Sequence, residues 1–218
     1  MAALTTWVYV SYRLQVDDMI YGKMILAAIA SRMEYRGSFI VFILTLIGFY
    51  AAQVAVIGVM IYRFKDIGGW TAGEIALLYA LLVLSQGIVA MLFAGLIDFS
   101  TYVREGSFDR VLLRPLSPML QILCLQFDPA GVTHISLGVI ALFIANSMLD
   151  LSWSFSFVFY MLVSIIGGAL ILAAIRIIVA ATAFFTVSNQ GLQHLFVFSS
   201  REFLLYPISI YARPVQYM

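Results

Sequence analysis

Long apolar runs separated by short charged segments are the main pattern of this chain, and their lengths predict helices that cross a membrane. Residues 39–62 and 131–149 contain no Asp, Glu, Lys or Arg, and residues 75–99 contain only Asp98, near their end. A helix rises 1.5 Å per residue, so each run covers the roughly 30 Å of a bilayer's hydrocarbon core. These runs are the first three crossings that we expect.

The longest apolar run, residues 155–198, is too long for one crossing. Its 44 residues include one charged side chain, Arg176, and as a single helix they would extend about 66 Å. We expect two crossings, 155–175 and 177–198, with a turn at Arg176, because an arginine at a helix centre costs roughly 2.5–3.5 kcal/mol. Residues 188–191 interrupt the last crossing and predict a helix end or kink near Gly191, with the next helix turning back.

Composition supports this interpretation. The chain is 63% hydrophobic and 11% charged, with a mean hydropathy of +1.03, whereas soluble domains carry roughly 25% charged residues. We therefore predict an all-α integral membrane protein, a polytopic helix bundle with one domain over residues 1–218. The net charge of +1 does not indicate a nucleic-acid partner, and the single Cys124 excludes an intramolecular disulfide and is expected to be a small buried side chain.

Three segments are too short or too polar to cross. Residues 17–36 mix an apolar block with charges and predict an interfacial helix at the amino end, the alternative being a solvated lead-in helix. Residues 120–127 form an apolar run of eight that is expected to follow the membrane surface. Residues 201–218 hold Pro207 and Pro214 and predict short interfacial helices.

Some polar and small residues lie at membrane depth. Gln53 and Gln86 are expected to form hydrogen bonds between helices, although they could also face a wet path. His134 stands at the start of a crossing and is interpreted as an interface residue in preference to a proton relay or a ligand. Four small residues at nearly helical spacing predict a ridge for close helix packing, namely Ser164, Gly168, Ala169 and Ala173.

The one long charged interruption is residues 98–119, which must lie in water. Ser107 is expected to cap a short amphipathic helix whose apolar edge is Phe108, Val111 and Leu112. Pro115 and Pro118 are expected to stop it. A short helix with an apolar edge and two arginines is typical of a docking element, the alternative being an inert solvated loop.

The distribution of basic residues predicts the orientation. With the amino terminus in the cytoplasm, eight basic residues lie inside and four outside. The inner ones are Arg13, Lys23, Arg32, Arg36, Arg104, Arg110, Arg114 and Arg176, and the outer ones are Arg63, Lys65, Arg201 and Arg213. The charged loop is therefore expected to be cytoplasmic.

Motifs for energy conversion are not found. The one Gly-Lys pair, Gly22-Lys23, has Asp17 and Met24 where a nucleotide-binding loop requires Gly and Ser or Thr. The sequence also has no HExxH and no Gly-x-Ser-x-Gly. We therefore expect no catalytic residue, metal site or cofactor in this chain, and a channel-forming subunit whose energy comes from elsewhere.

Three stretches carry a family resemblance: IGGWTAGE at 67–74, VREGSFDRVLLRP at 103–115 and REFLLYPISIY at 201–211. Together they resemble the type 2 ABC-exporter permeases, in the branch with about six spans and no fused ATPase. The resemblance implies a permease dimer in a bacterial inner membrane, resting on two subunits that bind ATP and magnesium. It also implies extracellular re-entrant helices after the fifth crossing, here residues 199–218, and a sixth span, which we expect to be missing from residues 1–218.

The resemblance implies that residues 103–115 form a cytoplasmic coupling helix. The apolar side chains would fill a groove on the ATPase, and the charged ones would fix the register. The residues concerned are Arg104, Glu105, Gly106, Ser107, Phe108, Asp109, Arg110, Val111, Leu112, Arg114 and Pro115. An importer subunit and a membrane scaffold without transport activity are the alternatives.

The orientation can be tested by cysteine labelling in a Cys124→Ser background. We expect cysteines at Gly69 and Ser152 to react with an impermeant reagent added to intact cells, and a cysteine at Ser107 to react only after lysis. Labelling of position 107 in intact cells would contradict the orientation.

Overall fold

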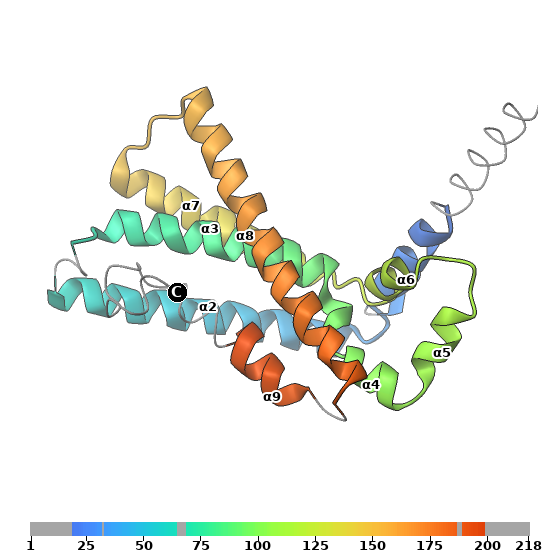
Figure 1. Cartoon of the computed structure of the whole chain (residues 1–218). Helices are drawn as coiled ribbons and strands as arrows, with labels where there is room; N and C mark the ends of the chain where they lie inside the picture. The colour runs from blue at the N-terminus through green and yellow to red at the C-terminus, as the bar shows by residue number, and fades with distance from the viewer. Residues whose placement is uncertain (1–18, 32, 65–68, 187–188, 199–218) are drawn as a thin grey trace, which may run out of the picture.

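The computed structural model of the chain describes residues 19–31, 33–64, 69–186 and 189–198 (Figure 1). In these ranges the regular secondary structure is helical and contains no strand, and four helices are long and apolar enough to cross a membrane. They are α2 (Arg36–Phe64), α3 (Ala72–Leu92), α7 (Gly131–Leu149) and α8 (Phe155–Ala181). The predicted all-α membrane class is thus confirmed.

The centre of the bundle is α3, which packs along α7 with the two backbones close together. Glycines make this approach possible. A Cβ atom added at Gly138 would lie 3.0 Å from the backbone nitrogen of Leu84, and one at Gly131 would lie 2.8 Å from that of Met91. Both distances are too short for a side chain, so α3 and α7 are held together by backbone proximity and dispersion contacts.

The second partner of α3 is α8, which crosses it obliquely (Figure 1). The hydroxyl of Ser85 donates to the carbonyl of Ile165 at 2.9 Å, which joins the two helices in the buried part of the contact. Ala169 and Ala173 pack with Val89 of α3. The small-residue ridge expected on α8 therefore faces α3, except for Ser164, which is exposed and donates to its own helix.

The attachment of α2 to the bundle includes polar contacts. The hydroxyl of Tyr50 and Nδ1 of His134 share a hydrogen bond between α2 and α7, and Tyr79 of α3 donates to Gln53 at 3.3 Å. The hydrogen bond between helices expected of Gln53 is confirmed. His134 stands near the start of α7 and is partly buried, with its ring edge-on against Tyr50, and its place at the membrane interface stays a prediction. Gln86 is buried on α3.

The turn expected at Arg176 is absent, because α8 runs through it to Ala181. The guanidinium donates to the carbonyl of Val89 at 3.3 Å and to that of Phe93 at 3.5 Å. These carbonyls end α3, where the helix dipole is negative and favours a cation. The position is also near the end of α8, so the cost that predicted a break at Arg176 does not arise.

The chain after α8 is broken, as the polar residues 188–191 predicted, although the helix ends earlier than expected. The turn η2 (Thr182–Phe184) follows α8, and α9 (Gln190–Gln193) and the π-helical turn η3 (His194–Phe198) come next. Asn189 donates to the carbonyl of Val179 at 3.0 Å, and Gln193 donates to that of Ile97. These two hydrogen bonds attach the segment after α8 to the end of α8 and to the residue that follows η1 (Ala94–Leu96).

A shorter apolar helix, Met19–Ser31, precedes α2 and lies beside α6 (Pro118–Leu125) in Figure 1. The hydroxyl of Tyr21 accepts a hydrogen bond from the backbone N–H of Ser117 at 3.1 Å. The predicted amino-terminal helix therefore contacts the segment just before α6.

The close approach of α7 to α3 predicts that Gly138→Ala destabilises the protein. The added methyl would lie 2.8 Å from Cγ of Leu84 and must displace that side chain against a tightly packed backbone, and overpacking of this kind costs roughly 1–3 kcal/mol. Thermal unfolding of the purified protein in detergent should show a lower midpoint. Gly167→Ala on α8 is the control, because nothing lies within 4 Å of its added Cβ. Equal midpoints for the two variants would contradict this account of the packing.

Candidate functional site

The charged loop forms three short helices at one end of the bundle (Figure 1). After α3 the chain passes through η1 (Ala94–Leu96) into α4 (Phe99–Arg104), α5 (Ser107–Leu112) and then α6. Gly106 joins α4 to α5 with φ of 68°, a left-handed conformation that glycine adopts at little cost. The structure thus has the predicted short helix, placed by a glycine turn directly after α4.

The capping role expected of Ser107 is wrong. Gly106 is the residue before the first turn, and the hydroxyl of Ser107 donates back to the carbonyl of Tyr102 at 3.3 Å. The role expected of Pro118 is wrong as well. The helix α5 ends at Leu112 before either proline, and Pro118 opens α6, where a missing N–H costs nothing.

The helix α5 has two different faces. Val111 is 5% exposed and belongs to the apolar core cluster at this end of the bundle, against which Phe108 packs. On the other face, Leu112 is 54% exposed and Leu113 is 85% exposed. The predicted apolar edge is therefore divided, because Phe108 and Val111 attach α5 to this chain and only Leu112 points outward.

Charged residues surround the outward face. Asp109 and Arg110 are exposed on α5, and Arg114 and Pro115 are exposed in the segment that follows. Arg104 and Glu105 are exposed at the turn before the helix. Two leucines in a ring of both charges, at the end of the molecule, are typical of a docking surface with an apolar centre and a polar rim. We call Asp109, Arg110, Leu112, Leu113 and Arg114 the outer α5 face.

Aromatic rings hold the inner face. Phe108 lies edge-to-face with Phe99 of α4 at 5.3 Å between ring centroids and with Phe184 of η2 at 5.5 Å. Phe99 and Phe184 are 5.4 Å apart, so the three rings close a triangle. Each such pair contributes about 0.5–1.5 kcal/mol beyond the buried area. The sequence analysis assigned no role to Phe99 or Phe184, because the fold brings them together from distant segments.

A buried glutamine secures the end of α5. The side-chain nitrogen of Gln121, on α6, donates to the carbonyls of Val111 at 3.2 Å and Leu116 at 3.1 Å, and the residue is 0% exposed. The Val111 carbonyl lies in the last turn of α5 and also accepts from the backbone N–H of Arg114 at 3.4 Å, and the Leu116 carbonyl lies in the segment that follows. The orientation of α5 is thus fixed at its end as well as by its aromatic ring.

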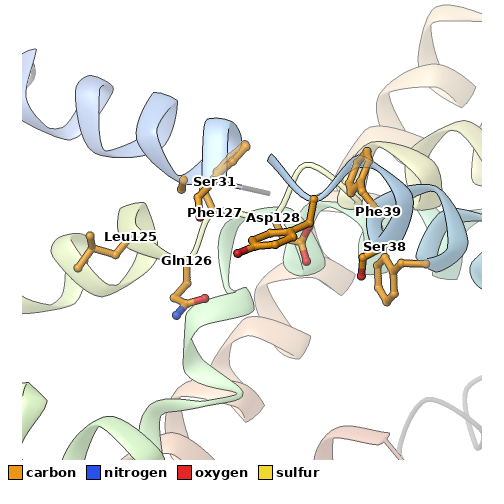
Figure 2. Close-up of a pocket in the computed structure, with 10 residues that line it drawn as sticks. Ser31, Ser38, Phe39, Leu125, Gln126, Phe127 and Asp128 are labelled. Carbon is orange, nitrogen blue, oxygen red and sulfur yellow. The ribbon is translucent and has the colours of Figure 1, made fainter. Parts of the chain in front are cut away.

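A cavity of about 560 Å³ opens nearby, between helix Met19–Ser31, the start of α2 and the segment after α6 (Figure 2). Aromatic rings form part of its wall, and hydroxyl, amide and carboxylate groups form the rest. The lining residues are Ala28, Ser31, Tyr35, Ser38, Phe39, Phe42, Leu125, Gln126, Phe127 and Asp128. Its volume is in the range of small-molecule sites. The cavity lies at the same end of the bundle as α6, beside the segment that leaves it.

Cys124 lies on α6 and is half-buried. Desolvation raises the pKa of its thiol, so little of the reactive thiolate is present at neutral pH. This agrees with the expected packing role. No group of three or more His, Cys, Asp or Glu side chains that could hold a metal occurs in the part of the chain that the structure describes.

Four apolar helices long enough to cross a membrane, and a charged end that exposes Leu112 and Leu113, define the class of the protein as a multi-pass membrane protein. The family model described as "ABC-2 family transporter protein" matches residues 38–218. The chain therefore belongs to the ABC-2 family of transporters and is a membrane subunit of such a transporter. No curated protein and no solved structure matches this chain.

Proposed function

We propose that this chain is the permease subunit of an ATP-driven exporter and that separate ATP-binding subunits dock on the outer α5 face. The observation that carries the proposal is the exposure of Leu112 and Leu113 on a helix whose other side is firmly attached to the bundle. An apolar pair ringed by charges gains stability when a partner removes it from water. ATP and magnesium would be held by the partner.

The charged residues around the two exposed leucines favour one orientation of the docked partner. Asp109 and Arg110 on α5 and Arg114 after it bring both signs of charge close to the leucines. Such rim charges contribute to partner choice and register more than to affinity. The structure thus supports the division of roles expected from the resemblance, except that Leu113 takes the place of Phe108 in the apolar centre.

Orientation follows from the partner. ATP-binding subunits work in the cytoplasm, so the end with α4, α5 and α6 would be cytoplasmic, as the excess of basic residues on that side also predicts. The amino terminus would then be cytoplasmic too, and α3 would begin on the outer side. We place the protein in a bacterial inner membrane.

Export is favoured over import by the position of the cavity. The opening bounded by Ser38, Phe39 and Asp128 lies at the α6 end, where a substrate would enter from the cytoplasm or the inner leaflet. For an importer subunit we expect instead a polar or aromatic small-molecule pocket that is reachable from outside. Two copies of the permease would enclose the path. The exposed apolar side chains of α2, Ile40, Val41 and Leu44 among them, can face lipid or the second copy.

The docking role predicts that Leu113→Asp abolishes both co-purification of the ATP-binding subunit and export. Burial of one leucine contributes roughly 1.5–3 kcal/mol, and a carboxylate without a partner in the groove adds a desolvation cost. Binding should therefore fall by more than about tenfold. Arg110→Ala, at a wetter position, should cost about 1 kcal/mol or less. Affinity capture from membranes measures both effects.

Leu120→Asp is the matched control for that experiment. Leu120 is also an exposed leucine, but it lies on α6 outside the outer α5 face. The Leu120→Asp variant should still co-purify with the ATP-binding subunit. A Leu113→Asp protein that is inserted, binds its ATPase and exports normally would exclude α5 as the docking site. A protein that never binds an ATPase and never transports would be a scaffold.

A further inference from the structure

The rings of Phe99, Phe108 and Phe184, which we call the aromatic joint, connect three segments that the chain does not connect directly. Phe108 belongs to α5, whose other face is the outer α5 face. Phe99 opens α4, which follows α3 after a short 3₁₀ turn. Phe184 ends the helical run that starts at Phe155 and contains α8. Any movement of α5 therefore acts on the ends of two candidate crossings at once.

The two crossings, α3 and α8, are also joined by hydrogen bonds at a level that precedes the aromatic joint along α8. Arg176 of α8 donates to the carbonyls of Val89 and Phe93 at the end of α3. Phe184 lies eight residues beyond Arg176, a distance of about 12 Å along a helix axis. The segment from Arg176 to Phe184 extends beyond these hydrogen bonds and ends in the aromatic joint. It can therefore convert a displacement of Phe108 into a tilt of α8 against α3.

The joint also has space for such a displacement. An apolar groove of about 200 Å³, open to the surface, lies beside the three rings and is lined further by Met119, Ile122 and Ala180. Phe184 is itself 54% exposed, so its ring is not enclosed on all sides. An unfilled space beside aromatic rings lets them change their packing without unfolding of the loop, which is what a switch between two discrete arrangements requires.

We propose that the aromatic joint transmits the movement of a docked ATP-binding subunit from α5 to α3 and α8, and that Phe184 is a positioning residue for transport. The proposal rests on the proposed function. Phe184 packs against Phe108 on the inner side of α5 and is not part of the outer α5 face, so its role would be to couple ATP hydrolysis to transport and not to bind the ATPase. Docking and coupling can therefore be separated by mutation.

The test is Phe184→Ala in the full transporter, with export, ATP hydrolysis and co-purification of the ATP-binding subunit all measured. We expect co-purification and ATP hydrolysis to be retained and export per ATP hydrolysed to fall by a factor within the roughly 5–150-fold range of coupling between sites. Phe184→Tyr keeps the ring and should retain coupled export. A purely structural role would lower the amount of folded protein and leave the ratio unchanged.

Phe185→Ala is the matched control. This substitution removes an identical side chain from the neighbouring position, where the phenylalanine is 90% exposed. Unchanged export per ATP in Phe184→Ala, or an equal loss in Phe185→Ala, would overturn the proposal. If Phe184→Ala does not insert, Phe184→Leu gives the same comparison, since it keeps apolar volume and loses the edge-to-face geometry. A different result would contradict the proposed function, namely that the ATP-binding subunit still co-purifies with the Leu113→Asp variant.

Discussion

The close approach of α3 to α7 is the contact on which the rest of this structure depends. Gly131 and Gly138 leave no room for a Cβ atom against the α3 backbone, so the register of the two helices is fixed within a narrow range. The end of α3 is fixed with it, and η1, α4 and α5 follow directly. The position of the outer α5 face is thus determined by the packing of α3 against α7 inside the bundle, and not by residues of the outer face itself.

Side-chain hydrogen bonds to backbone carbonyls are a second constraint on the ends of the helices. Three side chains donate such bonds at the α5 end of the bundle: Arg176 to α3, Asn189 to α8 and Gln121 to α5. Arg176 joins two helices that are far apart in the sequence, and the other two join neighbouring segments. They make this end a connected unit, and a force on α5 is therefore not confined to the loop.

Much of this architecture could be predicted from the chain. The helix α7 covers the range 131–149 that its lack of charge predicted, and the apolar spacing within the charged loop predicted the short helix α5. The turn at Arg176 could not be judged correctly, because its cost depends on carbonyls that α3 supplies from elsewhere. The inward direction of Phe108 was likewise hidden, since Phe184 is 76 residues away in sequence. The sequence pattern identifies the helices, whereas the segments that the fold brings beside a helix decide which of its faces is exposed.

The central claim, that the outer α5 face binds the ATP-binding subunit, is tested most directly by site-specific photo-cross-linking. A photoreactive amino acid would be placed at position 113 in one variant and at position 185 in another, and each variant would be irradiated in membranes that contain the ATP-binding subunit. The account predicts a cross-link to that subunit from position 113, which should respond to ATP, and none from position 185. Cross-linking from position 185 and not from position 113 would contradict it.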